Sequence, residues 1–243
     1  MKQHAPLIRK ASNERRTLVS AETAWNKVVK ELKSEKIKLA FYDDTVIPLL
    51  GDLKNKKVLD YGGGPGVLAS ALKKLGADVK EYDVSEDMRS QAAKKLGAEN
   101  IYHSVEEIPK GQFDFVICNL VLCIVSEDEV RRIVENIKGA LNQQGLAFIG
   151  FCNPKLLDVP ETNLDFRPTP KHEYEQNHSY MKTKKEGRYE IIENHRPIAW
   201  YENVYSEAAL VHVDTIFTPG YELKGKKIED FIIFKLKKGG QNE

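Results

Sequence analysis

The chain has 243 residues, and its 37 lysines and arginines against 36 aspartates and glutamates give a formal net charge of +1. This balance supplies no overall field to attract a polyanion or an anionic membrane, which disfavours a dedicated nucleic-acid-binding protein. Apolar residues make up 41% of the chain and charged residues 30%. That composition predicts a folded globular protein and excludes an intrinsically disordered one.

The N-terminus lacks the apolar stretch of a secretory signal, and the longest apolar run, residues 115–125, is too short to span a bilayer. We therefore expect a cytoplasmic protein without membrane association. The chain contains three cysteines, an odd number, and no CxxC pair. This pattern signals neither a disulfide framework nor a thiolate zinc site, and we expect no metal.

Short apolar strands and amphipathic helices alternate along the middle of the chain. Residues 1–19 come first and show no period, so we expect a mobile basic arm, followed by helices over 21–33 and 39–50. Strands are then expected at residues 57–61, 78–83, 100–103, 113–118 and 145–151, and helices at 67–75, 85–96 and 126–141. This alternation predicts an α/β fold with a parallel sheet that is covered on both faces.

The periodicity disappears over residues 152–176, where prolines stand at positions 154, 160, 168 and 170. We interpret this long irregular stretch as a lid. Residues 178–185 and 188–194 then flank a Glu-Gly pair, a pattern typical of a β-hairpin. The expected elements end with a helix over 200–210 and two strands over 211–217 and 229–237.

The strongest local motif is the run DYGGGPG, residues 60–66, between the first of these strands and the next helix. In an open parallel sheet, ligands bind beyond the carboxyl ends of strands, near the point where the strand order reverses, and glycines let the backbone approach them. The dinucleotide fingerprint GxGxxG requires glycine at position 67, where this chain has Val67. Pro65 also removes a backbone donor from the loop. The motif therefore disfavours a dinucleotide.

Two acids indicate what the loop accepts instead. Asp83 ends the second expected strand, where a carboxylate can accept hydrogen bonds from both hydroxyls of a ribose. Asp60, directly before the glycines, repels phosphate and suits a ligand with an ammonium group. Together the two acids favour an amino-acid nucleoside as the ligand of this loop. At this point the sequence resembles the class I S-adenosylmethionine-dependent methyltransferases of the small-molecule type (type 11/12-like), with a VLDxGxGxG first motif, over roughly residues 41–237.

Further motifs extend this resemblance. The runs YDVSEDM (82–88), HSVEEIP (103–109) and FDFVICN (113–119) resemble the second, third and fourth motifs of the family, although Ser104 stands where the third motif usually has an acid. The resemblance implies that S-adenosylmethionine is the methyl donor and S-adenosylhomocysteine the product. The residues that it assigns to the donor are Tyr42, Asp60, Tyr61, Gly62, Gly64, Gly66, Asp83, Val84, Met88, Ser104, Val105 and Asn119.

The resemblance also implies a Rossmann-like, doubly wound sheet of seven strands, mostly parallel with the last strand antiparallel, preceded by N-terminal helices. We expect a single methyltransferase domain over residues 20–237, with a lid and hairpin insertion at 152–200 after the fifth strand, and a tail at 238–243. The sequence leaves open whether the protein is a monomer or a homodimer.

Methyl transfer from a sulfonium is an in-line displacement, so the protein chiefly supplies proximity and alignment. A protonated acceptor still needs a base, and the residues that follow the fourth strand, LCIV (122–125), offer none. His178 and His195 are the candidate bases. Tyr180, Tyr201 and Arg196 are candidate substrate contacts, with Arg196 suited to a carboxylate or a phosphate.

The leading hypothesis is an enzyme that methylates an oxygen, nitrogen or carbon of a small-molecule metabolite. Two alternatives stay open. One is a tRNA or rRNA methyltransferase, in which the basic arm and the lysines of residues 224–238 contact phosphates. The other is a non-catalytic subunit that retains the fold as a scaffold, and that subunit is expected to bind neither S-adenosylmethionine nor its product.

Overall fold

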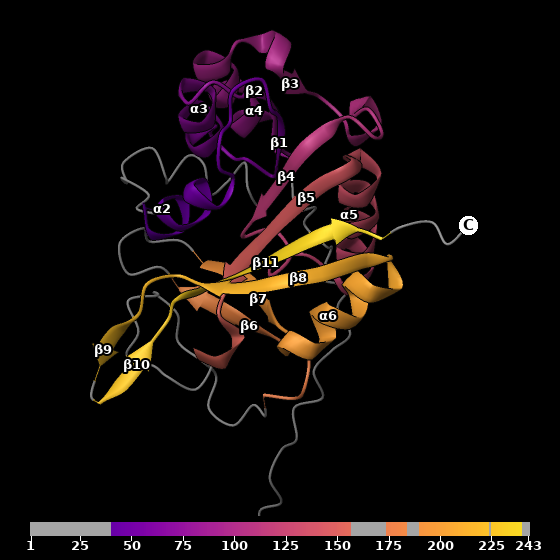
Figure 1. The fold of residues 1–243 in the computed structure, drawn as a ribbon. Helices are drawn as coiled ribbons and strands as arrows, with labels where there is room; N and C mark the ends of the chain where they lie inside the picture. Colours follow the sequence, from indigo (N-terminus) through magenta and orange to yellow (C-terminus); the bar gives the residue numbers. More distant parts are fainter. Residues whose placement is uncertain (1–39, 157–173, 184–189, 224, 240–243) are drawn as a thin grey trace, which may run out of the picture.

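A computed structural model of the chain describes residues 40–156, 174–183, 190–223 and 225–239 (Figure 1). Within these ranges a seven-stranded sheet has the order β3-β2-β1-β4-β5-β11-β8. Its strands are β1 (Lys57–Tyr61), β2 (Asp78–Tyr82), β3 (Ile101–Tyr102), β4 (Phe113–Asn119), β5 (Leu141–Cys152), β8 (Leu210–Phe217) and β11 (Phe231–Lys238). The helices are α2 (Ala40–Leu49), α3 (Val67–Lys74), α4 (Glu86–Leu96), α5 (Glu127–Ala140) and α6 (Ile198–Glu207).

The sheet is parallel from β3 to β5, and β11 runs antiparallel to both of its neighbours, β5 and β8. The expected α/β class and the antiparallel last strand are therefore confirmed. The chain moves outward from β1 through β2 to β3 and then returns to β4 on the other side of β1. The strand order thus reverses between β1 and β4, and this is where a doubly wound sheet binds its ligands.

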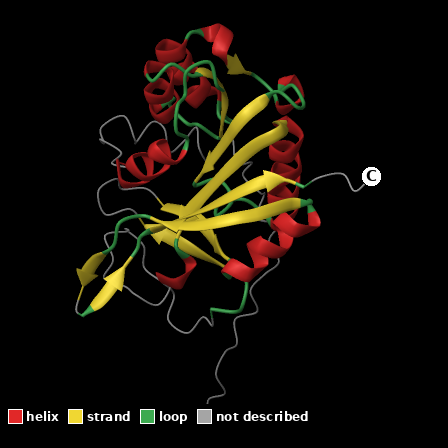
Figure 2. Ribbon diagram, viewed as in Figure 1, coloured by secondary structure: helices red, strands yellow, loops and turns green. Residues whose placement is uncertain are grey.

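Helices cover both faces of the sheet (Figure 2). On one face, α2, α3 and α4 pack apolar side chains such as Tyr42 and Leu72 against Phe148 of β5. On the other, α5 and α6 pack Val134 and Tyr205 against strands of the same sheet. Helix α5 starts where the sequence predicts, because Ser126 and Glu129 form a reciprocal capping box.

Two smaller antiparallel pairs lie beside the main sheet: β6 (His178–Thr183) with β7 (Glu190–His195), as expected, and β9 (Tyr221–Leu223) with β10 (Lys226–Ile228), which the sequence analysis missed. Strand β5 is also longer than expected. It begins at Leu141, whereas the expected strand began at residue 145, and the added residues lie at a register irregularity where Phe113 and Phe115 of β4 pair with Leu141 and Leu146. The extra residues of β5 are taken up there as a bulge.

Several expectations fall on residues outside the described ranges. These are the basic arm, the helix over 21–33, most of the proposed lid and the end of the tail. Of the lid, the described part includes a short 3₁₀ turn, η3 (Pro154–Leu156). Within the described ranges, every helix is too short or too polar to cross a membrane.

The contact between α2 and the sheet generates a stability prediction. A Cβ on Gly150 of β5 would lie 2.2 Å from Cε2 of the fully buried Tyr42. We expect Gly150→Ala to lower the free energy of unfolding by about 1–3 kcal/mol, because the ring has no room to move away. Gly139→Ala in α5 is the matched control, since its Cβ meets nothing within 4 Å and alanine favours a helix by about 0.5–1 kcal/mol. Urea denaturation measures both, and equal effects would contradict the packing described for Tyr42.

Candidate functional site

The glycine-rich loop joins β1 to α3 at the point where the strand order reverses. Gly62, Gly64 and Gly66 have φ values of 77°, 61° and 71°, in the left-handed region that glycine adopts without strain. The Gly62 amide donates to the Tyr82 carbonyl (2.6 Å), which holds the loop against the end of β2. A Cβ on Gly62 would lie 2.3 Å from Cγ2 of Val121, so only glycine fits there.

Asp83, directly after β2, faces this loop. Its Oδ2 accepts the Gly64 amide (3.0 Å) and its Oδ1 accepts the Ser85 amide (2.8 Å). Burial raises the pKa of Asp83, while these two hydrogen bonds act in the opposite direction. Each carboxylate oxygen has a second lone pair, so the fixed carboxylate can still accept from a pair of ligand hydroxyls. Beside it, Val84 is 38% exposed, and the buried Met88 comes within 3.9 Å of a Cβ built on Gly64.

A pair of buried carboxyl groups lies beneath the loop. Asp60 of β1 and Glu81 of β2 are register partners, and a Cβ on Gly63 would lie 2.8 Å from Cγ of Asp60 and 2.7 Å from Cγ of Glu81. Asp60 is 3% exposed and Glu81 is fully buried. Among the described residues, Asp60 Oδ2 and both oxygens of Glu81 lack a hydrogen-bond partner.

Burial is the main reason that both carboxyl groups hold their protons more tightly than usual. It raises the pKa of Glu81 to about 10 and that of Asp60 to about 7, and the negative charges of neighbouring aspartates add to both shifts. Glu81 is therefore protonated at neutral pH, and Asp60 is close to half ionised. The sequence analysis missed Glu81, although it stands two residues after the buried Val79, on the inward-facing side of β2.

Asn119 is the last residue of β4, next to β1 at the reversal of strand order. Its side-chain Oδ1 is buried, and no described residue donates a hydrogen bond to it. The next residue, Leu120, has a φ of 57°, and its amide donates to the Gly150 carbonyl (2.8 Å). A non-glycine residue in the left-handed region stores strain of the kind that functional sites retain. Here the left-handed residue Leu120 turns the chain sharply and leaves Asn119 at the carboxyl end of β4.

The other residues expected at the donor site lie in different surroundings. The Tyr42 ring is buried in an edge contact with Phe231, with centroids 6.5 Å apart. The Tyr61 ring packs against Tyr82, and Asn136 donates to its hydroxyl (3.5 Å). Both side chains belong to the core that supports the loop. Ser104 and Val105 lie after β3, at the start of the 3₁₀ turn η2 (Val105–Glu107).

The β6–β7 hairpin is fixed to the loop that follows β4. The Asn194 amide donates to the Cys123 carbonyl (2.7 Å), and the guanidinium of Arg196 donates to the carbonyls of Leu122 (2.9 Å) and Val125 (2.7 Å). Arg196 is 3% exposed and lies 4.9 Å above the Trp200 ring. The guanidinium thus holds two backbone carbonyls in place, while Arg196 also lines the cavity described next, and its expected role as a substrate anchor stays a prediction.

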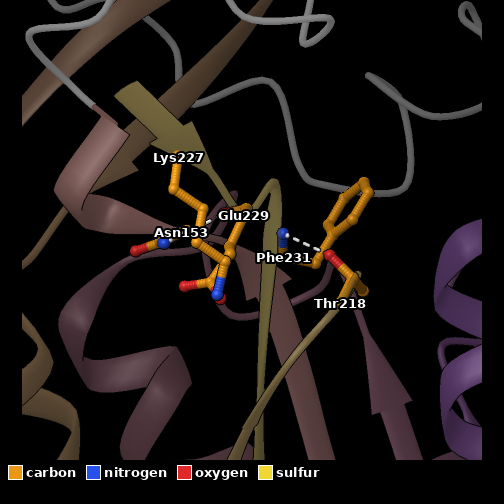
Figure 3. Close-up of polar contacts among 5 residues, drawn as sticks. All are labelled: Asn153, Thr218, Lys227, Glu229 and Phe231. Carbon is orange, nitrogen blue, oxygen red and sulfur yellow. Dashed lines mark hydrogen bonds and ion pairs between the residues drawn. The ribbon is translucent and has the colours of Figure 1, made fainter. Parts of the chain in front are cut away.

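A small cavity lies between the end of β5, the hairpin and α6. Its walls include three aromatic rings, one carboxyl group, one guanidinium, one imidazole and two amides, from Phe151, Tyr180, Tyr201, Glu193, Arg196, His195, Asn153 and Asn194. The Asn153 amide is held from outside, since its Nδ2 donates to the Glu229 carbonyl (2.9 Å; Figure 3).

The two candidate bases face each other across the hairpin. The rings of His178 and His195 lie 4.8 Å apart, and a ring nitrogen of each contacts a main-chain carbonyl: His178 that of Gln176 (3.0 Å) and His195 that of Tyr174 (2.7 Å). A carbonyl only accepts, so the ring nitrogen donates in both contacts. His195 lines the cavity, as do the expected substrate contacts Tyr180 and Tyr201. The described residues contain no cluster of acids, histidines and cysteines that would hold a metal.

Comparison with known proteins gives a match to the model of a methyltransferase domain over residues 59–149, which includes the glycine loop, Asp83 and Asn119. A curated relative, the ribosomal protein L11 methyltransferase of Vibrio parahaemolyticus, is 32% identical over 112 residues, or 44% of this chain and 38% of the relative. The chain thus matches less than half the length of the curated relatives.

Solved structures extend the likeness to most of the chain. A putative S-adenosylmethionine-dependent methyltransferase from Listeria monocytogenes has a TM-score of 0.64 at 18% identity, over 84% of this chain and all of that one. The 1,6-didemethyltoxoflavin-N1-methyltransferase of Burkholderia thailandensis, with bound S-adenosylhomocysteine, has a TM-score of 0.58 at 15% identity, over 91% of this chain and 92% of its own. Residues 59–149 thus match a methyltransferase domain, and most of the chain shares its fold with solved S-adenosylmethionine-dependent methyltransferases.

Proposed function

We propose that this protein transfers the methyl group of S-adenosylmethionine to a nucleophilic atom of a compact small molecule. The observation that carries this proposal is the pairing of a glycine loop with a fixed carboxylate, Asp83, where the strand order reverses. The loop lets a ligand backbone approach, and the carboxylate has lone pairs for a ribose diol.

The buried acids fit the charge of this donor. S-adenosylmethionine carries a sulfonium and an ammonium group, and the Asp60 carboxyl beneath the loop has an oxygen without a hydrogen-bond donor among the described residues. Asp43 of α2 is a second acid near the loop. It is half-buried, and its charge raises the pKa of Asp60. A dinucleotide phosphate would be repelled by the same groups. We assign Asp83 to the ribose, Asp60 to the ammonium end, Val84 and Met88 to the adenine, and Asn119 to the neighbourhood of the methyl group.

The cavity at the end of β5 is the proposed acceptor site. The carboxyl ends of β1, β4 and β5 lie side by side, so the cavity is two strands, or about 10 Å, from the glycine loop. The donor, when bound, supplies an electrophilic methyl group, and the chain contributes a wall that positions the acceptor. Proximity and alignment of this kind are the main catalytic requirement of a displacement at an activated methyl group.

A small acceptor is favoured by the buried lining of the cavity, in which Glu193, His195 and Tyr201 are each at most 5% exposed. A solved structure named for a small heterocycle, the didemethyltoxoflavin enzyme, also shares the fold over 91% of this chain. The second candidate is a protein acceptor, because the curated relatives are named as ribosomal protein L11 methyltransferases. Their similarity extends over less than half of this chain.

Methyl transfer can be tested directly with S-adenosylmethionine that carries a labelled methyl group. A thermal-shift screen of compact amines, phenols and carboxylates, with S-adenosylhomocysteine present, first selects acceptors, since a ternary complex stabilises the protein by mass action. Purified ribosomal protein L11 is assayed in parallel. We expect transfer to a small molecule and none to the ribosomal protein. Labelling of L11 alone would favour the second candidate, and the absence of S-adenosylhomocysteine binding would favour a scaffold.

Removing the charge of Asp83 tests the donor site. We expect Asp83→Asn to weaken S-adenosylhomocysteine binding at least tenfold, about 1.4 kcal/mol, because an amide presents one acceptor where the diol needs two. Asparagine keeps the shape of the side chain, and its carbonyl oxygen can still accept from one of the two backbone amides that Asp83 binds, Gly64 or Ser85. Asp87→Asn, at an exposed acid four residues along the chain, is the matched control for calorimetry. Equal affinities for the two variants would exclude the ribose assignment.

The charge of Asp60 predicts a pH dependence of donor binding. The pKa of about 7 means that Asp60 is mostly protonated at pH 6 and half ionised at pH 7. A ligand ammonium binds the ionised form, so affinity rises with pH, by about fivefold over this unit, and a proton is released on binding. The ligand's own ammonium stays protonated below its pKa of about 8.

Calorimetry at both pH values checks this prediction. The dependence should be absent in Asp60→Asn and unchanged in Asp52→Asn, whose carboxyl lies on the surface. An Asp60→Asn variant that keeps the wild-type slope would assign the titration to another group.

A further inference from the structure

We propose that the acceptor is a compact amine and that Glu193 of the β6–β7 hairpin both holds its ammonium group and takes its proton. This inference rests on the proposed methyl transfer and names the substrate class and the recognition residue of that reaction. It differs from the expectation that Arg196 holds an anionic substrate.

Glu193 brings a carboxyl group into the cavity at the end of β5. It lines the cavity and is 2% exposed. Its register partner across the hairpin is Tyr180, which also lines the cavity and whose hydroxyl hydrogen-bonds to the carboxyl group. The cross-strand pair orients the carboxyl group, and a cation that enters the cavity can bind to it. Among the cavity-lining residues that the structure describes, Glu193 is the one with a carboxyl group.

The same wall contains one positive charge, that of Arg196, and its guanidinium binds groups of the protein itself. Arg196 donates to the carbonyls of Leu122 and Val125 and to the hydroxyl of Tyr201 (3.4 Å), and its guanidinium lies over the Trp200 ring. These partners leave the guanidinium bound into the wall. An anionic acceptor would therefore meet the Glu193 carboxyl without gaining Arg196 as a partner, and like charges in a buried site repel strongly.

The remaining walls also suit a cation with an apolar body. Phe151 and Tyr201 line the cavity as an aromatic pair with centroids 4.2 Å apart, and Tyr180 adds a third ring. Aromatic faces attract cations through their quadrupole, and their area binds the apolar part of a ligand. The hydrogen bond from the Asn194 amide to the Cys123 carbonyl keeps this wall against the loop after β4.

The proton balance of amine methylation uses the same carboxyl group. An ammonium has no free electron pair, so one of its protons must first move to Glu193. The nitrogen lone pair then forms the bond to the methyl carbon as the sulfur–carbon bond breaks and its electron pair stays on sulfur. The products are a methylated ammonium, S-adenosylhomocysteine and a proton held by Glu193 that passes to solvent.

The test compares charge variants of one ligand shape on the full chain. In the presence of saturating S-adenosylhomocysteine, thermal shift is measured with about twenty compact amines such as benzylamine and 2-phenylethylamine and with their carboxylate counterparts, benzoate and phenylacetate. We expect stabilisation by amines and none by carboxylates. Stabilisation by carboxylates, or by no amine in the panel, overturns the proposal.

The best amine is then titrated by calorimetry into Glu193→Gln and into Glu202→Gln, a control at an exposed acid of α6. We expect at least a tenfold loss of amine affinity in the first variant and wild-type affinity in the second. S-adenosylhomocysteine binding should be unchanged in both, which shows that the variants are folded. Wild-type amine affinity in Glu193→Gln overturns the inference alone, whereas wild-type protein that binds no S-adenosylhomocysteine overturns the proposed function as well.

Discussion

Two carboxyl groups buried side by side beneath a glycine loop constrain this end of the molecule. Asp60 and Glu81 are register partners on β1 and β2, and a side chain at Gly63 would collide with both. A buried charge without a partner costs several kcal/mol, so one of the two acids keeps its proton. Where the loop passes over these two acids, at Gly63, it has no room for a side chain. Glycines at this loop therefore satisfy two requirements, the approach of the ligand and the space that the acids occupy.

The rest of the site is arranged around this constraint. Asp83 takes the Gly64 amide and so fixes the far side of the loop, while Val121 packs against Gly62 on the near side. The left-handed turn at Leu120 then carries the chain from β4 toward the hairpin. The proposed donor and acceptor sites are thus joined by a short run of backbone, residues 119–125, in which Asn194 and Arg196 hold the carbonyls of Leu122, Cys123 and Val125.

Much of this was predictable from the sequence, because it depends on local patterns. The period of apolar residues indicates the strands of the sheet, the run DYGGGPG indicates the loop, and Ser126 with Glu129 indicates the start of α5. The cavity was harder to predict, since its walls come from five segments that only the tertiary fold brings together. Glu193 lies in a strand of mixed polar and apolar residues, EIIENH, so no alternation marks it as buried. Arg196 was located, but its contacts with the backbone were not predicted, because a sequence does not show which carbonyls a guanidinium will meet.

Most of the residues that line the cavity come after the matched methyltransferase domain in the chain, starting at Phe151, and this order bears on how the acceptor of such an enzyme can change. The matched domain ends at residue 149, and all but one of the residues around the cavity follow it. Substitutions after β5 can therefore change the lining of the cavity while the glycine loop and Asp83 stay as they are. The two carbonyl contacts of Arg196 connect these parts of the chain, since they hold the segment after β5 to the loop after β4.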